Sequence, residues 1–395
     1  MKVALISESL DISYGGPANS IPNLVKNLKR DVPKIKIFVV KNKNSRLNNP
    51  LLSKDYFDYE TFDIEFGYGI DYCKSFILEL KNFFKGEDNG IIHVNNLWRW
   101  APYKALKMGH MSKFKTVLSA RGMLIKAAFN EKKYIKLIAW YLFFQHLLQN
   151  VDCIHVTSKD EAIQIRNLGL KTPLAIIPHG MQPYKFISAL DKKRAKKKLN
   201  LPIDRKYILF LSRISEHKGL DILIKSFLNI AKTHNDYDLL IAGKFSSSSY
   251  KSAIKKLITD KELDKRIIFV GEVKETIKEY VFQSSSLFVL PSRSENFGMV
   301  VGEALSYGIP VVTTYGTPWS ILSKQEIGAW IPRTVSDIER ELRHFCSMSD
   351  LERNSLQPKI KRLVEKYSWE KSAQATHDLY SWLLGEKGIP DTVIL

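Results

Sequence analysis

The chain is poor in cysteine and lacks long hydrophobic runs, and both features limit what it can be. Its 395 residues hold three cysteines, Cys73, Cys153 and Cys346, which are scattered and show no metal-ligand spacing. We therefore expect reduced, partly buried thiols. No run of about 18 apolar residues occurs, so no transmembrane helix is predicted. The apolar run at residues 1–6 is too short for a signal peptide, which predicts a cytoplasmic chain.

Acidic residues are outnumbered by basic ones. The sequence has 60 Lys and Arg against 41 Asp and Glu, which gives a formal net charge of +19. This charge suits nucleic acid, an anionic membrane or an anionic substrate. Because zinc-finger spacing, an aromatic RNA-binding strand and a recognition helix are all missing, nucleic acid is not a predicted partner. An enzyme at the inner face of the plasma membrane fits the charge better.

The length and composition indicate a globular protein with two domains. A chain of 395 residues is too long for one compact core. Its hydrophobic content of 45% and charged content of 26% are ordinary for such proteins. Predicted strands alternate with predicted helices along the chain, so the expected fold class is α/β with parallel sheets.

Residues 287–314 are the stretch around which the rest of the chain is organised. The apolar run Leu287–Leu290 predicts a buried strand, and a polar loop follows it. A helix is predicted from about Gly298 to Tyr307, and another strand from Ile309 to Thr314. The loop and the helix start therefore lie at the carboxyl end of a parallel strand, where open α/β sheets bind ligands.

Two carboxylates flank this helix start. Glu295 lies in the loop and Glu303 lies about two turns further on, so both side chains can face one cavity. The backbone N–H groups between them suit an anion such as a phosphate, and they belong to Asn296, Phe297, Gly298 and Met299. A nucleotide-sugar, which has both hydroxyls and phosphates, fits this arrangement. The alternative is a surface helix whose two glutamates are merely solvated.

The same stretch resembles a known family. Glu295, seven intervening residues and Glu303 are similar to the E-x7-E signature of the retaining glycosyltransferases of family four, and neighbouring positions follow the family pattern at Ser294, Asn296, Phe297, Gly298 and Ala304. The resemblance implies the GT-B fold, in which two Rossmann-like domains face each other across a cleft. It also implies that Glu303 holds the donor ribose and that Glu295 contacts the transferred sugar.

A second motif precedes this stretch. A strand predicted from Tyr207 to Leu211 leads into a loop that carries Arg213 and Lys218, and a helix follows. The pair predicts a cationic clamp for a diphosphate, and it resembles the Arg and Lys pair of the family. Two solvated charges are the alternative. Gly271 and Glu272 end a later strand and are predicted to contact the nucleotide base.

The first domain is predicted to supply the acceptor side. Gly15 and Gly16, between a strand and a helix, permit close approach to a ligand, and a similar family loop lies beside donor and acceptor. Trp98 and Arg121 follow two further strands at the same sheet edge. Many family members have His where Arg121 stands. Two roles are therefore considered for Arg121: it binds a phosphate, or it forms a structural ion pair with a nearby carboxylate. His179 is a candidate substrate contact or a structural turn residue.

Two segments raise the question of membrane contact. The helix predicted over Lys132–Asn150 carries four aromatic residues, Trp140, Tyr141, Phe143 and Phe144. We interpret them as core, with a membrane surface as the alternative. We interpret the basic run at residues 192–198 as a solvated helix near the domain boundary.

No metal or other cofactor is predicted. Asp236 and Asp238 superficially resemble the metal-binding D-x-D of another glycosyltransferase fold, but they precede a strand, so we interpret them as a turn. The expected domains are residues 1–200 for the acceptor and 201–368 for the nucleotide-sugar. Residues 369–395 are expected to form a helix that packs back on the first domain.

The sequence therefore predicts retaining transfer of a sugar from a nucleotide diphosphate to a glycan or polyprenyl-linked acceptor. The expected catalytic residues are Glu295, Arg213, Lys218 and Arg121. The loop around Arg121 resembles that of polysaccharide-assembly enzymes, which implies O-antigen or capsule synthesis. A non-catalytic nucleotide-sugar-binding protein and an epimerase on the same fold are the alternatives. The base, the sugar, the acceptor and the linkage stay open.

Overall fold

The computed structural model describes residues 1–8, 10–43, 45, 47–65, 72–130, 133–258 and 261–395. The chain divides into two compact units. Unit 1 comprises Met1–Gly180 and Trp369–Leu395, and unit 2 comprises Met181–Ser368. Within the described residues, no helix combines the length and the apolarity needed to cross a bilayer.

Unit 1 is built on an eight-stranded sheet in the order β14-β7-β6-β5-β4-β1-β2-β3. Neighbouring strands are parallel, except that β14 is antiparallel to β7. The central strands are near-continuous apolar runs, which suits a sheet that is covered on both faces. The strands are β1 (Lys2–Ser7), β2 (Lys34–Lys41), β3 (Tyr59–Asp63), β4 (Ile91–Asn95), β5 (Lys115–Ser119), β6 (Cys153–Val156), β7 (Leu174–Ile176) and β14 (Val393–Ile394).

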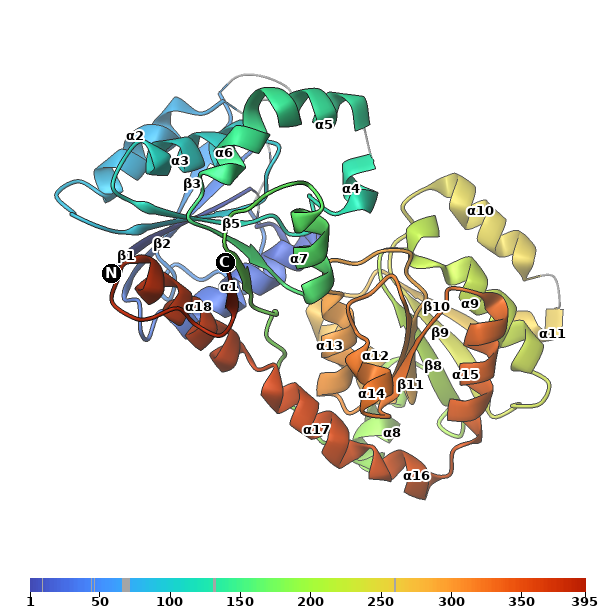
Figure 1. The fold of residues 1–395 in the computed structure, drawn as a ribbon. Helices are drawn as coiled ribbons and strands as arrows, with labels where there is room; N and C mark the ends of the chain where they lie inside the picture. The colour runs from blue at the N-terminus through green and yellow to red at the C-terminus, as the bar shows by residue number, and fades with distance from the viewer. Residues whose placement is uncertain (9, 44, 46, 66–71, 131–132, 259–260) are drawn as a thin grey trace. The chain divides into compact units, whose positions relative to one another are not determined.

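Helices cover both faces of this sheet, with α2, α3 and α6 on one face and α1 and α18 on the other (Figure 1). The described helices of unit 1 are η1 (Ile12–Tyr14), α1 (Gly16–Leu28), α2 (Lys74–Phe83), α3 (Trp100–His110), α4 (Lys126–Asn130), α5 (Lys133–Ala139), η2 (Trp140–Phe144), α6 (Gln145–Gln149), α7 (Lys159–Arg166) and α18 (Trp369–Leu383). The C-terminal helix α18 packs along α1, so the end of the chain belongs to unit 1.

Unit 2 is built on a six-stranded parallel sheet in the order β10-β9-β8-β11-β12-β13. This is the strand order of a dinucleotide-binding fold, with its switch point between β8 and β11. The strands are β8 (Lys206–Leu211), β9 (Tyr237–Ala242), β10 (Ile267–Gly271), β11 (Leu287–Leu290), β12 (Val311–Thr314) and β13 (Gly328–Ile331). The two sheets confirm the predicted fold class of two Rossmann-like domains.

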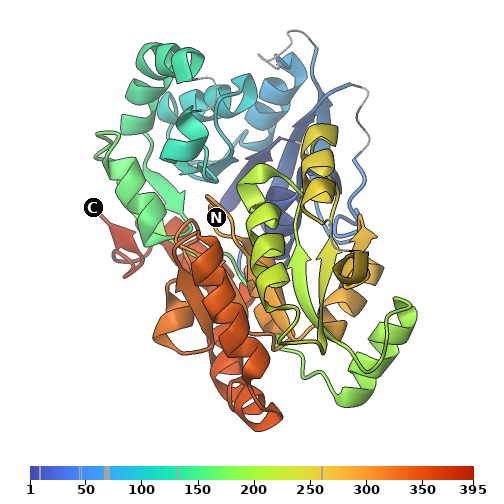
Figure 2. The same cartoon turned by 90° about the vertical axis from the view of Figure 1, so that its right-hand side faces the viewer.

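Helices also cover both faces of the unit 2 sheet in the two views (Figure 1, Figure 2). They are α8 (Ala189–Lys198), η3 (Glu216–Lys218), α9 (Leu220–Ile230), α10 (Ser248–Leu257), α11 (Lys261–Asp264), α12 (Glu275–Ser284), α13 (Met299–Ser306), α14 (Ile321–Lys324), α15 (Val335–Ser347), α16 (Asp350–Ser355) and α17 (Gln357–Lys366). Basic helix α8 packs against α12, so the boundary falls at Gly180–Met181 and not at the expected Leu201.

The helix expected over Lys132–Asn150 differs from the structure. Lys132 lies outside the described residues, and the segment that follows is α5, a π-helical turn η2, and α6. A π-turn holds an extra residue compared with an α-helical turn, so it rotates the side chains that follow it. Trp140 and Phe144 are buried, whereas Tyr141 and Phe143 are exposed. The interpretation of these aromatic residues as core is therefore right for two of the four.

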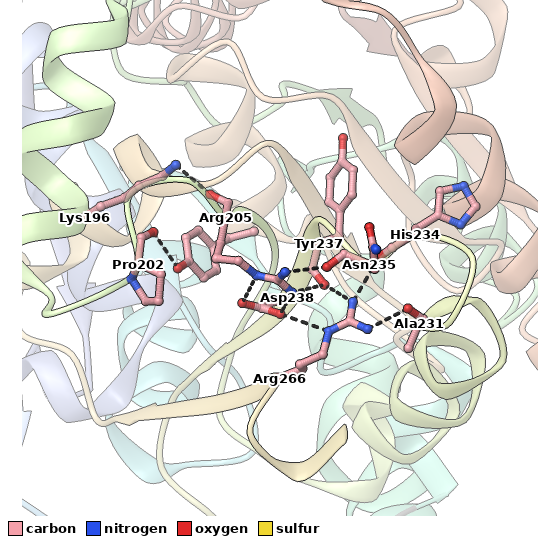
Figure 3. A network of polar contacts seen from close by, with 10 residues as sticks. Lys196, Pro202, Arg205, Ala231, His234, Asn235, Tyr237, Asp238 and Arg266 are labelled. Carbon is pink, nitrogen blue, oxygen red and sulfur yellow. Dashed lines mark hydrogen bonds and ion pairs between the residues drawn. The ribbon is translucent and has the colours of Figure 1, made fainter. Parts of the chain in front are cut away.

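Asp238 lies inside strand β9, and not in a turn as predicted. Its carboxylate is buried between two arginines (Figure 3). Nε of Arg205 donates to Oδ2 at 2.8 Å, and Nε of Arg266 donates to Oδ1 at 3.2 Å. Arg266 also donates to backbone carbonyls of Ala231 and His234. This cluster ties β9 to the segments on either side of it, so Asp238 has a structural role.

Replacing Asp238 with Asn should destabilise the fold strongly. The change leaves two partly buried guanidinium groups without their counter-charge, which costs about 3 kcal/mol. The measurement is the free energy of unfolding in urea. Asp236→Asn is the matched control, since its pair with Lys206 joins side chains that are 48% and 42% exposed and is worth less than about 1 kcal/mol. Equal effects of the two variants would contradict the structural role of Asp238.

Candidate functional site

The loops after β8 and β11 meet at the switch point of the unit 2 sheet. The two strands are parallel neighbours, paired through Leu209 and Phe288. Gly219, in the loop after β8, has a φ of +73°, and a Cβ added there would lie 2.3 Å from the carbonyl oxygen of Pro291. Only glycine permits this backbone approach together with this φ. The backbones of the two loops therefore lie so close at Gly219 that any side chain there would clash with the other loop.

Lys218 and Glu295 form an ion pair across these two loops. Their side chains are 19% and 13% exposed, so salt screens the pair less than a surface pair. The backbone N–H of Glu295 donates to Gly316 at 2.7 Å, which fixes the loop after β11. The structure thus joins residues from both predicted motifs. Arg213 lies at the start of the first loop with an exposed side chain.

Glu303 is held by a lysine that the sequence did not indicate. Nζ of Lys278, on α12, lies 2.6 Å from Oε1 of Glu303 on α13, and the side chains are 16% and 17% exposed. A lysine on an amphipathic helix belongs to no motif, so no sequence signal could have singled it out. Each of the two predicted carboxylates is therefore paired with a lysine from another part of unit 2.

The residues between the two glutamates play different parts. Gly298 has a φ of +78° and precedes the first turn of α13. Phe297 is buried against Trp319, and its carbonyl accepts a hydrogen bond from Nε1 of Trp319 at 2.5 Å. Phe297 therefore anchors the loop through its side chain, while Met299 is half-buried. The backbone around Gly298 is the part of this loop that suits an anion.

A cavity of about 460 Å³ lies at the carboxyl ends of β9 and β10, the same sheet edge as the two loops. Its lining residues are Gly243, Lys244, Phe245, Ser246, Ser247, Ser248, Lys251, Gly271 and Glu272. Gly271 and Glu272 were predicted to contact a base, and both line this cavity. The Phe245 ring supplies an aromatic wall, and Lys251 lies over it at 5.9 Å. The hydroxyls and the ring suit a small heterocycle with hydrogen-bonding edges.

In unit 1, the loops after β1, β4 and β5 meet at one sheet edge. Gly15 has a φ of +75° and caps α1, and a Cβ added at Gly15 or Gly16 would meet no atom of the described residues within 4 Å. The predicted open approach to the start of α1 is therefore present. Trp98 instead packs edge-on against Phe129 and Phe144, so its half-buried ring lies against the core.

Arg121 is the centre of a buried polar cluster in unit 1. Its Nε and Nη2 donate to Oδ1 of Asn95 at 2.8 and 2.6 Å, and its Nη1 donates to Oγ of Ser20 at 2.7 Å. Nη1 also lies 3.4 Å from Nε2 of His179, which brings two predicted residues together. Burial lowers the pKa of Arg121 to about 10, although the nearby carboxylate of Glu161 opposes this. The guanidinium is thus a partly buried cation whose hydrogen-bond partners here are neutral.

A separate chain of hydrogen bonds runs through buried histidines of unit 1. The phenol oxygen of Tyr380 lies 2.5 Å from Nδ1 of His93, and Nε2 of His93 lies 2.7 Å from Oγ of Ser119. Ser119 reaches Nδ1 of His155 at 2.7 Å, and Nε2 of His155 donates to the carbonyl of Ile177 at 2.8 Å. The chain connects α18 to β4, β5 and β6. These histidines lie in strands and fit no motif, so the sequence did not reveal them.

The comparisons with known proteins agree with this geometry. Residues 191–362 match the family model described as "Glycosyl transferases group 1", which confirms the predicted resemblance for this part of the chain. The chain is 29% identical over 194 residues to the lipopolysaccharide core biosynthesis mannosyltransferase LpsB of Rhizobium meliloti (strain 1021), a match that covers 49% of this chain and 52% of that protein. The chain spans about half the length of the curated relatives it matches.

Solved structures resemble almost the whole chain. Sucrose-phosphate synthase from Thermosynechococcus elongatus has a TM-score of 0.76 at 19% identity, covering 98% of this chain and 100% of that one. Anabaena HepE in complex with UDP-glucose has a TM-score of 0.72 at 16% identity, covering 96% of this chain and 100% of that one. At such low identity these likenesses show the fold alone.

Acid should destabilise the protein through its buried histidines. Burial lowers the pKa of His155 to about 4 and lowers those of His93 and His179 well below their usual value. The unfolded chain therefore binds more protons, so this stability is complete above about pH 6.5 and is lost as the pH falls. His155 alone should cost about 2 kcal/mol at about pH 5.

The measurement is the free energy of unfolding at about pH 7.5 and about pH 5. His155→Gln should reduce the difference in unfolding free energy between the two pH values, because glutamine does not titrate. His110→Gln, at an exposed position, should leave the slope as it is. An unfolding free energy that is the same at both pH values would contradict the burial of neutral histidines.

Proposed function

We propose that this chain, whose residues 191–362 form a glycosyl transferases group 1 domain, is a retaining glycosyltransferase. It moves a sugar from a nucleotide diphosphate to a glycan or lipid-linked acceptor. The observation that carries the proposal is the pairing of Lys218 with Glu295 at the switch point of unit 2. The two residues come from separate motifs, and their ion pair supports a shared role at the sheet edge where such folds bind ligands.

The donor is bound by unit 2. The base enters the cavity beside Phe245 and Gly271, and the ribose hydroxyls bind the carboxylate of Glu303. The diphosphate lies between the start of α13 and the cations of the β8 loop. HepE, a solved structure with the same fold, is described in complex with UDP-glucose, which supports a nucleotide-sugar as the donor.

Negative charge develops on the diphosphate as the bond to the sugar breaks. Lys218, Arg213 and the backbone N–H groups near Gly298 are positioned to stabilise it. Positive charge develops on the sugar ring, and the carboxylate of Glu295 stabilises it. A double displacement needs a nucleophilic carboxylate on the opposite face of the sugar. We propose instead that the acceptor attacks from the same face, assisted by the leaving phosphate, so the anomeric configuration is retained.

The acceptor belongs to surface polysaccharide synthesis. LpsB, the similar protein from Rhizobium meliloti, is described as a lipopolysaccharide core biosynthesis enzyme. The glycine loop at Gly15 leaves open space in unit 1 for a glycan, and Arg121 lies at the same sheet edge. We propose that the protein works in the cytoplasm at the inner face of the plasma membrane, where lipid-linked acceptors lie.

A donor should raise the melting temperature of the protein. Ligand at about 100 times its Kd stabilises the native state by about 2.7 kcal/mol, which is a shift of a few degrees. The measurement is a thermal-shift panel of UDP-, GDP-, ADP- and dTDP-sugars, in which sugars of one base should stand out. Glu303→Ala should weaken that shift, with Glu326→Ala on the surface as the control. No shift with any base would contradict the proposal.

Lys218→Ala should lower turnover about 100- to 1,000-fold, as the loss of one transition-state donor does. The measurement is the release of nucleoside diphosphate from the donor that the panel identifies, in the presence of candidate acceptors. Lys359→Ala removes a lysine from an exposed pair of unit 2 and should leave turnover unchanged. Normal turnover in the Lys218 variant would rule out the clamp. Donor binding without turnover by the unmodified protein would favour a nucleotide-sugar sensor.

A further inference from the structure

The helical segment from α5 through η2 has apolar residues on both of its sides. One side is core, where Trp140 and Phe144 are buried. The other side carries six large apolar residues in solvent: Tyr134 at 81%, Ile135 at 69%, Ile138 at 61%, Tyr141 at 69%, Leu142 at 68% and Phe143 at 53% exposure. We call these six residues the outer face. A helix that is apolar all round is normally buried, so this face is unusual for a water-exposed surface.

The outer face is continuous along the segment. Ile138 follows Tyr134 by four residues, so the two lie on one stripe of α5. The π-turn η2 then presents Tyr141, Leu142 and Phe143 outward in succession. Both views show α5 along the outside of unit 1 (Figure 1, Figure 2).

The sequence that contains this face is basic. Between residues 100 and 150 the sequence has nine Lys or Arg and a single acidic residue, Glu131. Tyr103 of α3 contacts Phe143 with ring centroids 6.3 Å apart, and Lys107 lies one turn further along the same side of α3. Lys107 and Lys126 are exposed. Lys136 is not available in the same way, because its ammonium donates to the backbone carbonyl of Ala128.

We propose that the outer face docks on an anionic phospholipid bilayer. Ile135, Ile138 and Leu142 enter the boundary between headgroups and acyl chains, and the two tyrosines lie at headgroup level. The exposed lysines bind the lipid phosphates, each adding to the attraction of a negative surface. A second copy of the chain fits less well, because a two-fold interface would bring the same lysines together. The inference deepens the proposed function and rests on it, since a lipid-linked acceptor lies in a membrane.

The test is vesicle flotation of the full chain. The vesicles are phosphatidylcholine alone, or phosphatidylcholine with phosphatidylglycerol in roughly equal parts. The protein should float with the anionic vesicles, and added salt should reduce this binding because it screens the lysines. Equal binding to both vesicle types would overturn the anionic partner, and no binding to either would overturn the docking face.

Two variants test the surface itself. Ile138→Ser with Leu142→Ser removes two exposed apolar side chains and should weaken flotation at least tenfold. Lys107→Glu with Lys126→Glu should weaken it about tenfold on anionic vesicles. Leu351→Ser is the matched control, since Leu351 is an 83% exposed leucine of unit 2, and it should float as the unmodified protein does. Unchanged flotation of both double variants would contradict the assignment to the outer face.

The thermal shift with donor separates this inference from the proposed function. It should be the same in the outer-face variants as in the unmodified protein, which also shows that they fold. If the unmodified protein floats with anionic vesicles but shows no thermal shift with any donor, the result counts against the proposed glycosyltransferase function and leaves the docking face standing. Sedimentation velocity tests the alternative partner, a second copy of the chain. If the unmodified protein is a dimer and Ile138→Ser converts it to a monomer, the outer face binds a second copy and the lipid proposal is overturned.

Discussion

The contact between the loops after β8 and β11 is the constraint on which the unit 2 site depends. Parallel strands end at one edge of a sheet, so two loops far apart in sequence leave it side by side. Gly219 brings the backbones together at a distance that no side chain allows. Lys218, one residue before it, then reaches Glu295. Lys218 and Glu295 thus form one arrangement, set by strand order and a single glycine.

In unit 1 the loops at the carboxyl ends of the strands are joined by side-chain hydrogen bonds and not by a close backbone approach. Its switch point lies between β1 and β4, and Arg121 after β5 ties that edge together through Asn95 and Ser20. The guanidinium is partly buried, and its hydrogen bonds to Asn95 and Ser20 offset the cost of desolvation. Beside it, neutral histidines connect the strands to Tyr380 of α18. The C-terminal helix therefore supports the sheet edge that we assign to the acceptor.

The outer face of α5 and η2 belongs to a segment that is apolar on both of its sides. The same short segment supplies core residues such as Trp140 and exposed residues such as Tyr141. In an ordinary amphipathic helix the exposed side is polar, because water solvates it best. Here the exposed side is apolar and its surroundings are basic. A partner with an apolar interior and a negative surface matches both properties, and a bilayer has them.

Much of the fold and the two main motifs could be predicted from the sequence. Apolar runs marked the buried strands. The sites of Lys218 and Glu295 follow from loops at strand ends, and that of Glu303 follows from the helix after one of these loops, because these signals are local. The sequence could not give the pairing of Lys278 with Glu303, the histidine chain, the arginines around Asp238 or the domain boundary at Gly180. Nor could it decide which aromatic residues of residues 140–144 face outward. Each of these depends on which helices and strands pack together. Hydrophobic periodicity in a single sequence reports local secondary structure and does not report such long-range contacts.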